Sequence, residues 1–134
     1  MKKVVLYTDE GIKSVEFEFN EPEVRYDNLN RWVSVKASNR TIILSGTNFL
    51  AYDTEIQRTS ASLDFGMLWQ KKANEVYVNS ERILVIFSAS QNPLEMFHGV
   101  SLSMERDGEI YHFKIDDKDI WLYGLNFLVL NKNK

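Results

Sequence analysis

Residues 107–119 read DGEIYHFKIDDKD, and this stretch guides the interpretation of the fold. The dipeptide Asp107-Gly108 is typical of a two-residue hairpin turn, because such turns need residues that tolerate positive φ. The residues that follow alternate between apolar and polar side chains, as expected for a strand with one buried face. The stretch therefore predicts an antiparallel hairpin whose charged residues face water.

The predicted turn also determines which residues face one another across this hairpin. Leu102 would lie opposite Phe113 on the apolar face, and Ser103 would lie opposite His112 on the polar face. A shift by one residue would move the apolar side chains to the wrong face, so the pattern favours this register. His112 is then expected on the surface of a strand.

A period of two runs through most of the chain. Residues 15–19, VEFEF, alternate apolar residues with acids, and residues 83–87, ILVIF, are apolar throughout, which predicts a central strand covered on both faces. Strands are expected at 3–8, 15–19, 31–37, 41–45, 49–53, 55–63, 83–87, 100–106, 109–115 and 120–130.

Helical signals are few. Asn92 and Pro93 resemble a helix start and Gly99 a helix stop, which predicts a short helix at 92–99, and 63–73 is expected to form another. The predicted fold is mainly β: an antiparallel β-barrel or a two-sheet β-sandwich of about eight short strands with one or two short helices.

Length and composition predict one domain. The chain has 134 residues, of which 44% are hydrophobic, and this is enough to bury a core without disulfides or metals. No internal repeat or linker is apparent, so residues 1–130 are expected to form a single β-rich domain and residues 131–134 a frayed tail.

The absence of cysteine excludes a disulfide framework, a thiolate metal site and thiol catalysis. The N-terminal stretch has no long apolar run, so a cytoplasmic location without membrane insertion is expected. The net charge of −3 argues against nucleic acid as a general partner.

Catalytic and cofactor motifs are not found. The two histidines, His98 and His112, are separated by the predicted hairpin and helix, and residues 116–119 lack the spacing of a calcium loop. The glycines form no phosphate-binding pattern, and no nucleophile motif is present. We therefore expect no enzyme activity, no metal and no cofactor.

The most informative binding signal lies in residues 25–40, RYDNLNRWVSVKASNR. On the predicted strand, Trp32 shares a polar face with Ser34 and Lys36. A tryptophan in this position is either covered by another part of the fold or serves as an anchor for a partner. The candidate partner-binding residues are Trp32, Lys36, Tyr26, Arg31 and Arg40.

These observations favour a non-catalytic binding module that recognises another protein or associates with itself. The composition is compatible with an accessory protein of a phage or mobile element, and equally with an immunity-type inhibitor or a small bacterial domain. Two alternatives stay open. One is a small-ligand-binding β-barrel lined by aromatic residues, and the other is a barrel that binds single-stranded nucleic acid. The lining expected for the first is Phe17, Phe19, Phe113 and Trp121.

Overall fold

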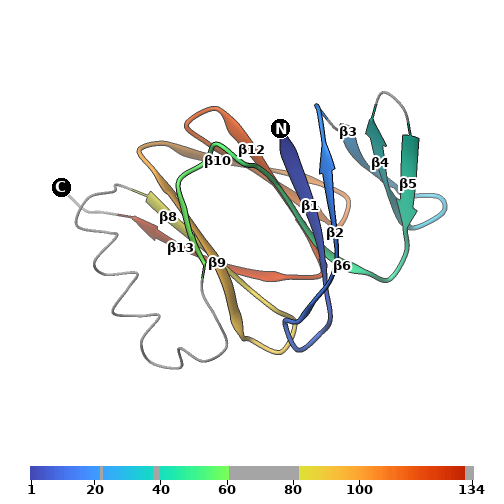
Figure 1. The fold of residues 1–134 in the computed structure, drawn as a ribbon, viewed down its shortest axis with the longest axis horizontal. Coiled ribbons are helices and arrows are strands. Elements are labelled where there is room, and N and C mark those ends of the chain that lie inside the picture. Colours follow the sequence, from blue (N-terminus) through green and yellow to red (C-terminus); the bar gives the residue numbers. More distant parts are fainter. Residues whose placement is uncertain (22, 38–39, 61–81, 132–134) are drawn as a thin grey trace.

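Figure 1 shows a computed structural model of the chain, which describes residues 1–21, 23–37, 40–60 and 82–131. Every regular element in these ranges is a strand, which confirms the predicted all-β class. The strands are β1 (Lys2–Tyr7), β2 (Lys13–Phe19), β3 (Glu23–Asp27), β4 (Trp32–Ala37), β5 (Arg40–Leu44), β6 (Asn48–Asp53), β7 (Arg58–Ser60), β8 (Arg82–Phe87), β9 (Pro93–Gly99), β10 (Leu102–Asp107), β11 (Ile110–Ile115), β12 (Lys118–Tyr123) and β13 (Asn126–Asn131).

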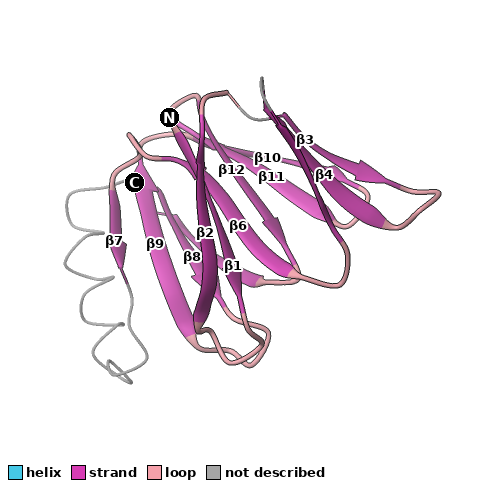
Figure 2. Cartoon of the chain, turned by 45° about the vertical axis from the view of Figure 1, so that its right-hand side comes forward, coloured by secondary structure: helices cyan, strands magenta, loops and turns pink. Residues whose placement is uncertain are grey.

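The strands form three open antiparallel sheets. A six-stranded sheet has the order β10-β11-β12-β6-β1-β2, a four-stranded sheet the order β13-β8-β9-β7, and a three-stranded sheet the order β3-β4-β5. The six-stranded sheet lies between the other two, as Figures 1 and 2 show. The described strands therefore form three layers, where the sequence predicted one barrel or two sheets.

Two hydrophobic cores fill the spaces between these layers. The first core, between the six-stranded and four-stranded sheets, contains Leu50, Leu84, Phe97 and Phe113. The second core lies on the opposite face of the six-stranded sheet, under the three-stranded sheet, and includes Phe49 and Trp121. Strands β1 and β6 contribute side chains to both cores, which explains why they are buried on both faces.

The chain contains an internal repeat, contrary to the interpretation of the sequence. Strands β1 to β6 and strands β8 to β13 make the same pairings: the first strand pairs with the second and the sixth, and the third, fourth and fifth form a meander. We call these the first and second repeat units. In each unit, the meander packs over one face of the group formed by the first, second and sixth strands.

The first hairpin of each unit matches in detail. Its strands begin at Lys2 and Lys13 in one unit and at Arg82 and Pro93 in the other, an offset of 80 residues. Both hairpins have an irregularity before their last pair. In both loops a hydroxyl, Thr8 Oγ1 or Ser88 Oγ, accepts a hydrogen bond from the backbone N–H four residues later.

Corresponding residues also recur in the sequence. The run IILSGTNFL at 42–50 corresponds to IWLYGLNFL at 120–128, with six of nine positions identical. Gly46 and Gly124 are the shared glycines, with φ of 63° and 71°, so both turns need the left-handed conformation that glycine adopts without strain. The meander offset is 78 residues, because the turn after β10 is two residues shorter than the turn after β3.

The predicted helix at 92–99 is wrong. This segment is β9, which pairs with β8 on one side and β7 on the other. The apparent helix cap belongs to a hairpin loop, where the side chain of Asn92 donates a hydrogen bond to the carbonyl oxygen of Glu10 in the other unit. The two loops lie side by side at one end of the molecule (Figure 2). The helix predicted at 63–73 lies outside the described residues.

For the hairpin of β10 and β11, the predicted register differs by two residues from the register in the structure. Leu102 pairs with Ile115 and Glu105 with His112, so the turn is Gly108-Glu109. Only the glycine of this pair has positive φ, as a type II′ turn requires at its first central position. A shift of two residues preserves the faces, and Phe113 and Ile115 lie in the first core as predicted. The face that was expected to meet water is partly covered, because Ile110 lies in the second core. The strand predicted at 120–130 is two strands, β12 and β13, separated at Gly124.

Candidate protein-binding surface

The outer face of the three-stranded sheet, the side that faces away from the second core, carries Trp32 and Lys36, two of the residues that the sequence singled out. In β4, Val33 and Val35 point inward and are fully buried, so Trp32, Ser34 and Lys36 lie on the outer face. A shallow depression of about 310 Å³ on it is lined by Glu23, Arg25, Ser34 and Lys36.

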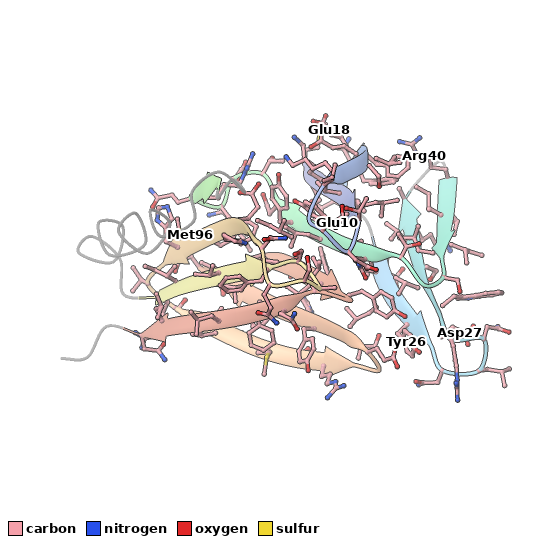
Figure 3. All side chains as sticks on the ribbon, turned by 90° about the horizontal axis from the view of Figure 1, so that it is seen from below. Glu10, Glu18, Tyr26, Asp27, Arg40 and Met96 are labelled. Atoms are coloured by element: carbon pink, nitrogen blue, oxygen red, sulfur yellow. The ribbon has the colours of Figure 1, made fainter. Side chains whose placement is uncertain are left out.

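The structure does not bring all five candidate residues together. Trp32 is half-buried and Lys36 exposed on the outer face. Tyr26 points inward, where its ring lies 6.3 Å from that of Tyr123. Arg40 is at the far end of the sheet from Tyr26 (Figure 3), with its guanidinium 4.9 Å from the Phe19 ring centroid. Arg31 is exposed in the turn before β4, with φ of 57°.

The charges beside the outer face are mixed. Glu23 and Arg25 form an exposed ion pair on β3. The next acid on this strand, Asp27, has a pKa below its ordinary value, mainly because the backbone N–H of Asn30 donates a hydrogen bond to its carboxylate. Acids therefore lie close to the basic Arg25 and Lys36, so this face has no continuous positive stripe of the kind that binds nucleic acid backbones.

Open strand edges are the second candidate surface. An edge strand exposes unpaired backbone groups, and proteins usually protect it with charged residues. Edge strands β2, β3 and β10 each carry three charged residues. In contrast, β13 reads NFLVLN and has none, and β5 reads RTIIL and has one, at its first position. The edge strand β7 has only three residues, of which Arg58 is charged. Among the described edge strands of five or more residues, β5 and β13 are therefore the least protected against pairing with another chain.

Each of these two edges also exposes a large apolar side chain. Ile43 of β5 is 54% exposed and Leu128 of β13 is 40% exposed. Ile43 projects from the outer face, directly opposite Ser34 in the sheet and therefore beside Trp32. Sequence reasoning missed the edge at β13, because an apolar strand indicates burial on both faces and strand order cannot be read from the chain. Its lack of charge was the available signal.

The two histidines lie in separate places. His112 Nε2 is 2.8 Å from Asp119 Oδ1, and the histidine ring stacks on Trp121 with centroids 4.8 Å apart. His98 lines another cavity, of about 390 Å³, and partial burial lowers its pKa. Across the part of the chain that the structure describes, no three His, Asp or Glu side chains gather closely enough to hold a metal ion.

The aromatic residues expected to line one ligand cavity are divided between two cores. Phe113 belongs to the first core, whereas Phe17, Phe19 and Trp121 belong to the second. The six-stranded sheet separates the two groups.

The described ranges contain no helix that is long and apolar enough to span a membrane. Comparison of the chain with protein families, curated proteins and solved structures finds no match.

Proposed function

We propose that this protein is a non-catalytic module that binds another protein chain by strand addition at the open edges of β5 and β13. In strand addition, backbone hydrogen bonds hold the added strand, and side-chain contacts select it. The observation that carries the proposal is that these two edges are apolar and nearly without charge, whereas β2, β3 and β10 are charged edges.

The outer face would extend the contact made at β5. A strand added beside β5 would lie next to Ile43, and its neighbours would reach toward Trp32. Aromatic and large apolar side chains that lose their water on binding contribute most of the affinity of a protein interface. Lys36 and Arg25, at the margin of this patch, would affect the association rate more than the affinity.

The alternatives from sequence have weaker support. A ligand barrel needs aromatic residues around one cavity, and these lie in two cores. A nucleic acid platform needs a basic face, and Glu23 and Asp27 lie among the basic groups of the outer face.

The proposal is tested by affinity capture from the native host with four variants. Ile43→Lys and Leu128→Lys place a charge on each open edge, and Trp32→Ala removes the aromatic side chain. Leu29→Lys is the matched control, because Leu29 is 90% exposed in the turn between β3 and β4 and belongs to neither edge strand. Captured proteins are quantified by mass spectrometry, and circular dichroism checks that each variant is folded.

We expect at least one captured protein to decrease with one edge variant and with Trp32→Ala, by roughly tenfold for a loss of about 1.4 kcal/mol. Leu29→Lys should capture as the unchanged protein does. Equal capture by all four variants would show that the open edges and the outer face bind nothing, and the proposal would be wrong.

A further inference from the structure

One strand pairing joins the two repeat units, and it makes the six-stranded sheet continuous from one unit to the other. Strand β12, the last strand of the second meander, pairs antiparallel with β6, the last strand of the first unit. We call the pairing of β12 with β6 the joint. In this joint Trp121 lies opposite Ala51, and Leu122 lies opposite Leu50. The side chains of this joint lie in the two cores: Leu50 and Leu122 are completely buried in the first core, and Trp121 is 8% exposed in the second.

Each strand of this joint has a counterpart that lacks the same partner. The counterpart of β12 is β5, and the counterpart of β6 is β13, by the correspondence of the repeat units. Among the described strands, β5 pairs only with β4 and β13 pairs only with β8, so each lacks a described partner on the side where its counterpart is paired. One molecule thus carries one completed joint and the two separate halves of another.

The exposure of the side chains fits two unoccupied halves. Ile43 corresponds to Trp121 but is 54% exposed, and Leu128 corresponds to Leu50 but is 40% exposed. A single chain cannot close this second joint on itself, because β5 and β13 are at the outer edges of different sheets, on opposite sides of the six-stranded sheet (Figure 1). The missing partner of each edge is therefore available from a second copy of the chain.

We propose that the protein assembles head to tail, with β5 of one copy paired antiparallel to β13 of the next. The joint inside the chain sets the register: Ile43 lies opposite Val129 of the next copy, and Leu44 lies opposite Leu128. The pairing of β12 with β6 is the precedent for this contact, since β5 and β13 are the counterparts of these two strands. The inference rests on the proposed strand addition and identifies its partner as a second copy.

The contact uses different surfaces on the two molecules. Such a heterologous contact either closes into a ring or continues as a filament, and it is not a symmetric dimer. This predicts an unusual behaviour in mixtures. A variant with a damaged β5 still has an intact β13, and a variant with a damaged β13 still has an intact β5.

The experiment measures molar mass by light scattering over a wide range of concentrations. The unchanged protein should form species larger than a monomer. Ile43→Lys alone and Leu128→Lys alone should both be monomeric. An equimolar mixture of the two variants should form a one-to-one dimer and nothing larger, because only one intact joint can form.

Cysteine pairs test the register directly, since the chain has no cysteine of its own. A mixture of Ile43→Cys and Val129→Cys proteins should form a mixed disulfide dimer under mild oxidation. A mixture of Ile43→Cys and Leu130→Cys proteins is the control, because a shift of one residue places the two thiols on opposite faces of the sheet.

A monomer at all concentrations, together with equal disulfide yields in the two mixtures, would overturn self-assembly. If Ile43→Lys nevertheless reduces the capture of a different protein, the edge still binds protein and only the identity of the partner is wrong. If Leu128→Lys is monomeric but Ile43→Lys alone still forms a dimer, the contact is symmetric and the head-to-tail proposal fails.

Discussion

Leu50 and Leu128 hold corresponding positions in the two repeat units, yet Leu50 is completely buried beside β12 whereas Leu128 is 40% exposed at the open edge of β13. The same residue type in the same local structure therefore has two environments. Leu50 lies in the first core and beside β12, whereas Leu128 belongs to neither core and lies on an edge strand, so the two leucines are a matched pair for experiment.

We expect Leu50→Ala to lower the free energy of unfolding by about 2–5 kcal/mol, because it leaves a cavity in a packed core. Leu128→Ala should change it by no more than about 0.5–1 kcal/mol when measured on the monomer, as is usual for a surface substitution. Urea denaturation at low protein concentration measures both. Equal losses would mean that Leu128 is covered in the monomer.

Tyr7→Phe should stabilise the protein. The Tyr7 hydroxyl is buried and has no hydrogen-bond partner among the described residues, and burial raises the pKa of this group. A buried polar group without a partner costs about 1–3 kcal/mol, and phenylalanine removes it while keeping the ring. The corresponding residue of the second unit is already Phe87.

Thermal denaturation compares Tyr7→Phe with Tyr123→Phe as the control. The Tyr123 hydroxyl donates a hydrogen bond to Glu109 Oε2 at 3.2 Å, so its removal should not stabilise. A lower melting temperature for Tyr7→Phe would mean that its hydroxyl makes a bond that the described residues do not include.

Gly99→Ala should destabilise the protein by about 1–3 kcal/mol through overpacking. A Cβ at this position would lie 2.5 Å from Asp116 Oδ2 and 2.6 Å from Ile115 Cγ2. The backbone of Gly99 has no positive φ, so the cost would be steric only. Val100→Ala, at the next and 62% exposed position, is the control and should have little effect on urea denaturation.

Asp116 should make the free energy of unfolding depend on pH in the acidic range. Its pKa is below the ordinary value of 3.8, chiefly because the backbone N–H of Ser101 donates a hydrogen bond to its carboxylate. The lowered pKa belongs to the folded state. The stabilisation that ionised Asp116 provides is therefore complete above the pKa of the unfolded state, and it is lost as the pH falls through the pKa of the folded state. Stability should therefore decrease below about pH 4.

Asp116→Asn tests this pH dependence, since asparagine keeps the shape of the side chain and tolerates the φ of 48° at this position. The variant should be less stable at neutral pH and should lose less stability than the unchanged protein between neutral and acidic pH. Unfolding curves at several pH values measure the difference. Parallel curves for the two proteins would contradict the assigned role.

Much of the fold could be predicted from the pattern of apolar residues along the chain. Residues 83–87 were expected to form a central strand, and β8 is paired on both sides and buried on both faces. The helix predicted at 92–99 failed because Asn and Pro fit a hairpin loop as well as a helix start. Local propensity could not separate these outcomes, since pairing with β8 and β7 decided between them.

The internal repeat was missed because most of it is conserved only as a pattern. The two first hairpins share pairing and loop hydrogen bonds but few residues, whereas 42–50 and 120–128 are identical at six of nine positions. For the candidate surface, alternation correctly placed Trp32 with Lys36 on one face. It could not place Tyr26 or Arg40, because their positions depend on how sheets pack on one another.

The joint between β6 and β12 has a consequence for folding. Every other pairing in the six-stranded sheet except β1 with β6 links strands that follow one another in the chain, so it can form early and locally. Pairing Tyr52 with Ile120 closes a much longer loop, whose entropy must be lost before the contact gives any stability. We therefore expect the hairpins and meanders to form first and the joint to form late, as the step that limits the folding rate.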